Sequence, residues 1–201
     1  MRKNDLRLWL WGLVIVIGVA VVLYPGVLQN RQKKVQQELI RIYLKGEMPS
    51  KELLREKEML GVLWIPKAEC QLPIFRGTDE FVLKSGIGLL EGSSELSSER
   101  SGKTGVHCVL CGHSGMPEIY AFDRIDVLEK GDHIYIVSHK QILVYTVTKQ
   151  LTVLPEEVHL LLQPSQFANE ITLLTCTPYG INTHRLLVQA ELSRCFGGSA
   201  T

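Results

Sequence analysis

The apolar run from Leu8 to Leu28 restricts what this chain can fold into more than any other feature. It reads LWLWGLVIVIGVAVVLYPGVL, carries no charge, and has about the length that an α-helix needs to cross a bilayer. Trp9, Trp11 and Tyr24 stand near its ends, where amphipathic rings favour the headgroup region. A buried core helix would show a polar stripe, and this run has none. The run therefore predicts a transmembrane helix.

A basic leader of Arg2, Lys3 and Arg7 precedes the run, as it does in cleavable signal peptides. The run is longer than a signal core, and no small-x-small cleavage site lies before the charged stretch from Arg31 to Lys34. We therefore expect an uncleaved, single-pass anchor. Its orientation is not decided by the positive-inside rule, because Lys and Arg flank both ends.

The chain is predicted to have four parts. Residues 1–28 form the leader and anchor, and residues 29–59 form a helical neck that lifts the following domain off the membrane. Val35, Leu39 and Ile42 give the neck its rough helical spacing. Residues 60–193 form one folded domain, and residues 194–201 form a tail.

Short apolar runs divided by Gly, Pro and Ser indicate that the folded domain is mainly β. The predicted strands are Val62 to Ile65, Gln71 to Phe75, Gly105 to Cys111, His133 to Val137, Ile142 to Val153, Ile171 to Cys176 and Arg185 to Leu192. Short helices are expected at Asp79 to Lys84 and at Glu118 to Ile125. Many short strands with few helices favour a closed or nearly closed β-barrel.

Composition narrows the class of function. The formal net charge is +1, and no basic face with interleaved aromatic residues is evident, so no nucleic-acid partner is expected. Five cysteines, an odd number, match a disulfide framework poorly. At least one thiol is therefore free.

Cys176 is the strongest candidate for that free, reactive thiol. It ends the apolar strand Ile171 to Cys176, and the chain then breaks at Thr177-Pro178-Tyr179-Gly180. A cysteine at a strand end is held rigidly from behind while its thiol faces a groove. The alternative from position alone is a buried core cysteine, a common fate of this residue type.

Two other residues favour the reactive interpretation. Arg185 opens the next strand across a tight turn, where its cation can lower the pKa of the thiol or stabilise an oxyanion. His113 follows another apolar strand between Gly112 and Gly115, and its imidazole can accept and return a proton near neutral pH. The alternative for Arg185 is an ordinary surface cation.

Five further histidines compete with His113: His107, His133, His139, His159 and His184. His184 is the serious competitor because it adjoins Arg185. Neighbouring side chains on a strand point to opposite faces, so His184 is expected to face away if Arg185 faces the groove. By the same alternation Cys108 and Cys111 point apart, which favours core packing over a zinc or redox pair.

These segments resemble the sortase family, and specifically its class C, pilin-polymerising branch. The segment TLLTCTPYGINTHRLLV, from Thr172 to Val188, is similar to the branch's Cys-to-Arg signature almost throughout. GHSGMP, from Gly112 to Pro117, resembles its histidine segment, although Ser114 stands where a basic residue is usual. The weaker matches LGVLWIPK, LPIFRGT, GIGLLEGSS and LEKGDHIYIV follow in the family's order.

The resemblance implies a closed eight-stranded sortase-type β-barrel with short peripheral helices. Cys176 would be the nucleophile, His113 the acid/base, and Arg185 the group that supports substrate and oxyanion. Substrate contacts are expected from Thr175, Thr177, Tyr179 and Ser114. No cofactor or metal is implied. The catalytic domain would lie outside a Gram-positive cell, with the N-terminus in the cytoplasm.

The implied reaction cleaves a Leu-Pro-any-Thr-Gly-like (LPXTG-like) sorting signal after threonine and leaves a thioester on Cys176. A lysine amine of another pilin then resolves the thioester, so the expected partners are pilins or surface proteins that carry the signal. Two alternatives remain open. The acceptor is a cell-wall amine in one, and in the other the chain is an inactive sortase-like module that binds pilin as an assembly factor.

Overall fold

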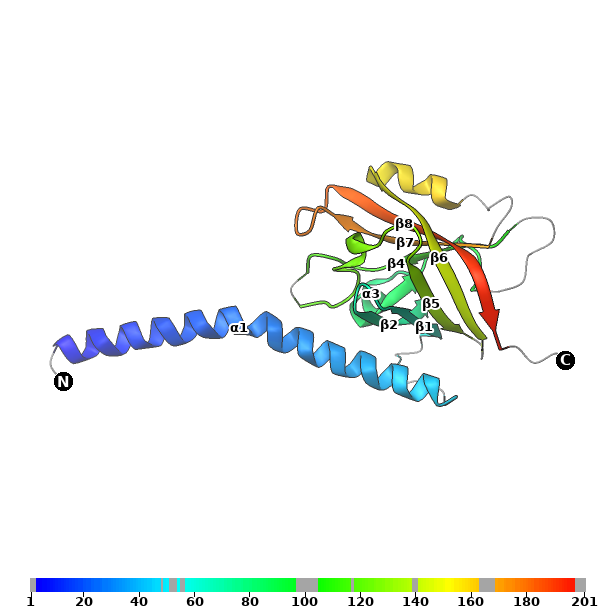
Figure 1. Ribbon diagram of the computed structural model, residues 1–201. Coiled ribbons are helices and arrows are strands. Elements are labelled where there is room, and N and C mark those ends of the chain that lie inside the picture. Colours follow the sequence, from blue (N-terminus) through cyan, green and yellow to red (C-terminus); the bar gives the residue numbers. More distant parts are fainter. Residues whose placement is uncertain are drawn as a thin grey trace.

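The computed structural model describes residues 3–47, 49–50, 54, 57–96, 105–116, 118–138, 141–162 and 169–197. Its body is a closed β-barrel (Figure 1), which confirms the predicted fold class. The strands are β1 (Met59–Ile65), β2 (Cys70–Arg76), β3 (Ile87–Leu89), β4 (His107–Cys111), β5 (His133–Ser138), β6 (Gln141–Val153), β7 (Glu170–Thr177) and β8 (His184–Phe196). Around the barrel they follow the order β1-β2-β3-β4-β7-β8-β6-β5.

The directions of the strands bring the ends of two of them to one rim. All neighbouring pairs are antiparallel except β2 with β3 and β4 with β7, which are parallel. Because β4 and β7 run the same way, the segment after Cys111 emerges beside the end of β7, where β8 begins. Cys176, Arg185 and the segment that carries His113 all lie at this rim.

Side chains alternate between the barrel interior and its outer face. On the three central strands the inward residues Leu110, Leu173 and Val188 belong to the main core. The neighbouring residues Val109, Leu174 and Leu187 form a separate apolar cluster on the outer face. The candidate site continues the outer cluster toward the rim.

One of the two short helices predicted from the sequence is present, and the other is not. The helix expected near Asp79 is α3 (Glu80–Ser85), and the Asp79 carboxylate caps it by accepting from two backbone N–H groups. The helix expected at Glu118 to Ile125 is wrong, because the chain there forms turns before a short 3-10 helix, η1 (Ile125–Val127). Nearby residues Ile119, Ala121 and Phe122 are all buried, a spacing that one face of a helix does not provide.

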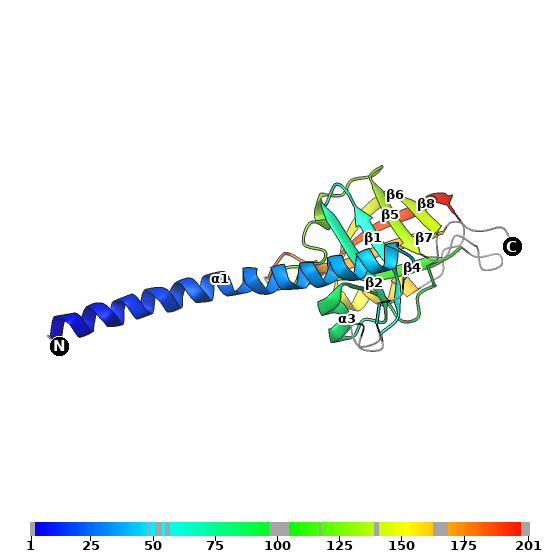
Figure 2. The same cartoon turned by 90° about the horizontal axis from the view of Figure 1, so that it is seen from below.

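Helix α1 (Lys3–Leu44) is continuous through Pro25 and leaves the barrel as a long rod (Figures 1 and 2). It is the one helix among the described residues that is long and apolar enough to cross a membrane, and its apolar stretch is unburied. Its second half packs on the barrel, where Leu39 and Ile40 join a cluster with Val62 and Phe75. The expected neck is thus helical to Leu44 but lies against the barrel; residues 48, 51–53 and 55–56 fall outside the described part.

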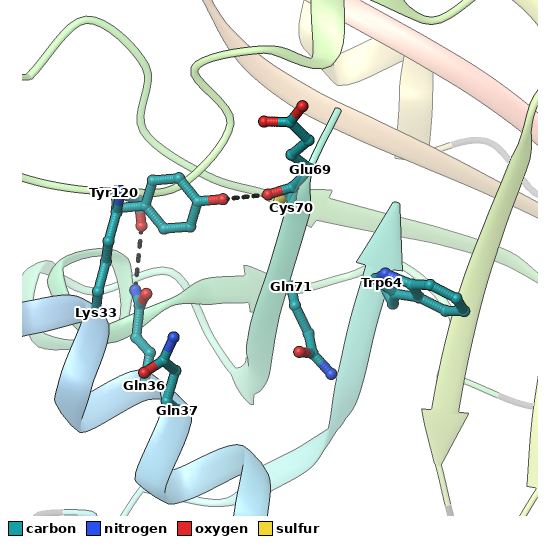
Figure 3. Close-up of a pocket in the computed structure, with 8 residues that line it drawn as sticks. All are labelled: Lys33, Gln36, Gln37, Trp64, Glu69, Cys70, Gln71 and Tyr120. Carbon is teal, nitrogen blue, oxygen red and sulfur yellow. Dashed lines mark hydrogen bonds between the residues drawn. The ribbon is translucent and has the colours of Figure 1, made fainter. Parts of the chain in front are cut away.

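The junction between α1 and the barrel holds a polar pocket of about 410 Å³ (Figure 3). Gln36 is almost fully buried there, and its side-chain amide donates to the carbonyl of Tyr120 at 3.1 Å. The Tyr120 hydroxyl donates to the carbonyl of Glu69 at 2.6 Å. The first bond ties α1 to the loop that follows β4, which carries His113 near its start, and the second ties that loop to the turn before β2.

Candidate active site

Cys176 and Arg185 lie directly opposite each other on β7 and β8 as paired residues of the antiparallel ladder. Paired residues of such a ladder project from the same side of the sheet. Both side chains continue the outer face beyond Leu174 and Leu187, and both are half-buried. A thiol and a permanent cation therefore share one open edge of the sheet.

His113 reaches this edge from β4. The ladder between β4 and β7 extends one residue past Cys111, because the Gly112 N–H donates to the Leu174 carbonyl at 3.1 Å. Gly112 therefore lies beside Thr175, and His113 follows it on the segment that leaves β4 at this edge. Cys111 belongs to the outer apolar cluster, and the alternation continued by two residues places His113 on the outer face as well.

Two hydroxyl groups hold these strand ends together. The Ser114 hydroxyl donates to the carbonyl of Cys176 at 2.6 Å, and the Thr175 hydroxyl donates to the carbonyl of Gly112 at 2.7 Å. Both side chains are buried, with 6% and 4% of their surface exposed. Their hydroxyls are thus engaged within the protein, and contact of Ser114 and Thr175 with substrate stays a prediction.

The remaining expected contacts lie where the chain leaves β7. Thr177 is the last residue of β7 and is half-buried, while Tyr179 is 61% exposed in the turn before β8. Both line a small cavity of about 40 Å³ that also borders Cys176, Ser114 and Asp123. Their contact with substrate stays a prediction.

The electrostatics of the edge follow from partial burial. Burial, and after it the charge of Lys84 on α3, lower the pKa of His113 below its usual value. His113 is therefore neutral near pH 7, the form that accepts a proton. Arg185 donates to the carbonyls of Asn182 and His184, both at 3.1 Å, which orients its guanidinium at the start of β8.

The competing residues lie elsewhere. His184 pairs with Thr177, one position along from Cys176, so it faces away from Arg185 as expected. Cys108 lies in the main core and Cys111 in the outer cluster, which confirms that they point apart. Burial first, and the charge of Cys176 second, raise the pKa of Cys111 to about 12, so this neighbouring thiol stays protonated.

All five cysteines are free in the structure. Cys70 and Cys108 are buried, and burial raises the pKa of each thiol to about 12. Cys195 is exposed, but it lies near the opposite end of β8 from Arg185. Within the described residues, no group of three or more His, Cys, Asp and Glu side chains is arranged to hold a metal ion.

Sequence reasoning missed two residues that border the site. Asp123 lines the small cavity, and its carboxylate accepts from the Gly115 N–H at 3.1 Å, so it shapes the loop that carries His113. Lys84 acts on His113 through its charge from a separate helix. Neither residue carries a sequence signal that separates it from a surface Asp or Lys, because only the fold brings them to the site.

Comparisons with known proteins agree with the observed fold. The family model of the sortase domain matches residues 63–193. A sortase A of Streptococcus agalactiae is 29% identical over 68% of this chain, but the aligned part is only 53% of that relative's length. The solved structure of sortase C-1 from Actinomyces oris has a TM-score of 0.63 and 38% identity, covering 68% of this chain and 75% of that one.

A pilus-related sortase C of Group B Streptococcus matches over a longer stretch, 84% of this chain and 91% of that one, with 32% identity and a TM-score of 0.61. The match to the family model spans most of the barrel, including β4, β7 and nearly all of β8. By this match, and by a barrel whose rim carries the paired Cys176 and Arg185, the chain belongs to the sortase family.

Proposed function

We propose that the chain is a membrane-anchored cysteine transpeptidase that polymerises pilins. One observation carries the proposal: Cys176 lies opposite Arg185 at the rim where the segment of His113 leaves β4. A nucleophile, a base and a permanent cation on one face are the parts that acyl transfer through a thioester requires. The pilus-related relative supports the choice of acceptor.

In the first step the Cys176 sulfur attacks the carbonyl carbon of threonine in a Leu-Pro-any-Thr-Gly-like signal, and His113 accepts the thiol proton. Arg185 stabilises the resulting oxyanion. The carbon–nitrogen bond then breaks, and His113 returns the proton to the departing glycine amine. A thioester on Cys176 remains.

In the second step the ε-amine of a pilin lysine attacks the thioester carbonyl. The new carbon–nitrogen bond forms as the Cys176 thiolate leaves, and the proton lost by the amine passes through His113 to the thiolate. The product is an isopeptide bond. Limited access of water to the half-buried edge favours the amine over hydrolysis.

The outer apolar cluster is a buried support next to the site. Val109, Leu174 and Leu187 lie along the sheet before Cys176, and Val158 of the 3-10 helix η2 (Pro155–Leu162) packs against them. These three side chains are at most 8% exposed, so an extended peptide would bind at the half-buried edge beyond them, beside Cys176. Helix α1 would anchor the protein, with the barrel outside the cell.

The full chain in detergent, mixed with a peptide that carries the signal, tests the proposal. Mass spectrometry is expected to show the acyl fragment on Cys176 and, after a pilin-derived lysine peptide is added, its transfer to the lysine. The Cys176→Ala variant is the control. Absence of any adduct on the wild-type chain refutes the enzyme; an adduct that resolves only with a cell-wall peptide amine refutes the pilin acceptor.

A further inference from the structure

We propose that the turn between β7 and β8 is a second membrane contact of this protein. Ile181, in that turn, enters the headgroup region of the bilayer that α1 crosses, so that the Cys176 end of the barrel opens toward the lipid surface. This inference rests on the membrane anchorage proposed above.

The first observation is where the barrel begins along α1. The helix is continuous, and Gln32 lies one helical turn after Leu28, the end of the apolar run. At the rise of an α-helix this is about 6 Å along the axis. The Gln32 side chain already contacts the barrel: its amide donates to the Lys84 carbonyl at 2.6 Å, and its oxygen accepts from the Tyr120 N–H at 2.5 Å. The barrel therefore starts at headgroup level.

The second observation is that α1 contacts the loop after β4 through several side chains. One turn beyond Gln32, Gln36 donates to the Tyr120 carbonyl, as Figure 3 shows. Between them the ammonium of Lys33 lies 4.2 Å from the centre of the Tyr120 ring. With the bond from Gln32, both backbone polar groups of Tyr120 are held by α1. This loop has a fixed place relative to the helix.

The same loop packs against the turn between β7 and β8. A Cβ atom on Gly115 would lie 2.4 Å from the backbone nitrogen of Gly180, so the two backbones touch at a point that admits only glycine. Gly115 also has a φ of 76°, which favours glycine, and its N–H is held by Asp123. Ser114 adds its bond to the Cys176 carbonyl. A chain of contacts thus fixes the turn relative to α1.

The third observation is the direction and chemistry of the turn. Figures 1 and 2 both place it at the end of the barrel nearest the N-terminal half of α1. Ile181 is 68% exposed, more than any other large apolar side chain described outside α1. Arg31, Lys33 and Lys34 lie at the start of the packed half of α1, where they suit anionic headgroups.

A lipid surface is the occupant that these observations favour, because the exposed Ile181 lies at the end of the barrel nearest the unburied apolar stretch of α1. Apolar side chains at a protein tip bind the boundary between headgroups and acyl chains. The consequence is functional: acyl donors anchored in the same membrane would meet Cys176 at the height at which they emerge.

Depth measurement tests the inference. In a Cys176→Ala, Cys195→Ser background, Ile181→Cys carries an environment-sensitive dye, and the full chain is reconstituted in phosphatidylglycerol–phosphatidylethanolamine vesicles. Lipids with a shallow nitroxide are expected to quench this dye about threefold more than a dye on native Cys195 in the Cys176→Ala chain. Cys195 is the matched control, since it lies on the same strand near its opposite end. Equal weak quenching of the two dyes, with equal access to aqueous iodide, overturns the inference.

A third label, on Val16→Cys in the Cys176→Ala, Cys195→Ser background, separates this failure from failure of the anchorage. Deep quenching at Val16 with an aqueous dye at position 181 leaves the anchor intact and refutes only the second contact. Absence of quenching at Val16 refutes the anchorage itself.

An activity measurement gives an independent readout. Ile181→Glu in vesicles is expected to lower turnover of a lipid-anchored signal peptide several-fold relative to Ile181→Leu, and to leave turnover of the free peptide unchanged. An equal loss on both substrates contradicts a membrane contact and makes Ile181 a substrate contact. Tyr179, which is predicted to touch substrate, stays unchanged in every variant.

Discussion

The inner and outer faces of the β4–β7–β8 sheet have the same strands and opposite chemistry. Inside, Leu110, Leu173 and Val188 are fully buried in the barrel core. Outside, the apolar cluster is small, and past Leu174 and Leu187 it gives way to Cys176 and Arg185 at a half-open edge. The period of two along each strand assigns every residue to one face or the other. A reactive thiol is thus held by a rigid core without being part of it.

The cysteines show how the inner and outer faces of the sheet differ in thiol reactivity. Burial raises the pKa values of Cys70 and Cys108 to about 12, which keeps these inner thiols protonated and inert. Cys176 has Arg185 as its cross-strand partner and His113 on the adjoining segment.

Replacing the outer thiol is expected to have the largest effect. Cys176→Ala lowers signal-peptide cleavage by about 10⁴-fold or more, because no other side chain supplies the nucleophile. The measurement is peptide turnover followed by chromatography, with thermal unfolding to show that the barrel is intact. Cys195→Ser, at an exposed thiol of the same sheet, serves as the control and retains full activity. A residual thioester in Cys176→Ala would contradict the assignment.

Removal of the Arg185 cation is expected to have the second-largest effect. Arg185→Ala is expected to lower kcat by about 10²–10³-fold, the usual cost of losing one oxyanion donor. Arg185→Lys should recover part of the rate, since it keeps the charge but not the planar fork. Arg194→Ala, an exposed arginine farther along β8, is the matched control. Equal rates in Arg185→Ala and Arg194→Ala would refute the role.

Loss of the hydrogen bond from Ser114 to the backbone of Cys176 is expected to have a smaller effect on the rate. Ser114→Ala removes the hydrogen bond to the Cys176 carbonyl, which should lower kcat about tenfold through loss of alignment and destabilise the fold by about 1 kcal/mol. Ser193→Ala removes a similar bond, to the carbonyl of Val144, away from the site. We expect that control to change stability alone; a rate loss of the same size in both variants argues against positioning by Ser114.

The smallest effect is a shift in pH dependence. Because the pKa of His113 is lowered, its neutral form persists below its usual pKa, and the acid limb of kcat/KM should lie there. Lys84→Gln removes a positive charge that opposes protonation, so the pKa of His113 rises and the acid limb moves to higher pH. The shift is small because burial contributes more than Lys84 does. Lys149→Gln, at an exposed site on β6, should leave the profile in place; a downward shift in Lys84→Gln would contradict the assignment.

Local patterns predicted much of the barrel, because alternation of apolar and polar residues is a property of each strand by itself. The strands around Cys111, Cys176 and Arg185 were predicted within a few residues of their observed ends. β3 was missed because Ile87–Leu89 is too short to show a period. The helix predicted around Tyr120 failed because that segment is shaped by bonds to Gln32 and Gln36, which are distant in sequence.

By itself, the sequence determined the apolar helix and the β character of the domain, because each depends on residue type and local spacing. It also made Cys176, His113 and Arg185 candidates, and the resemblance to a family signature favoured them over the alternatives of a core cysteine and a surface cation. Only the tertiary structure decided how these residues meet. The parallel pairing of β4 with β7 brings the segment of His113 to the rim where β7 ends, and the register of β7 with β8 sets Cys176 against Arg185. The tertiary structure also decided that α1 is hydrogen-bonded to the barrel at Tyr120. Such long-range contacts depend on the packing of the whole chain.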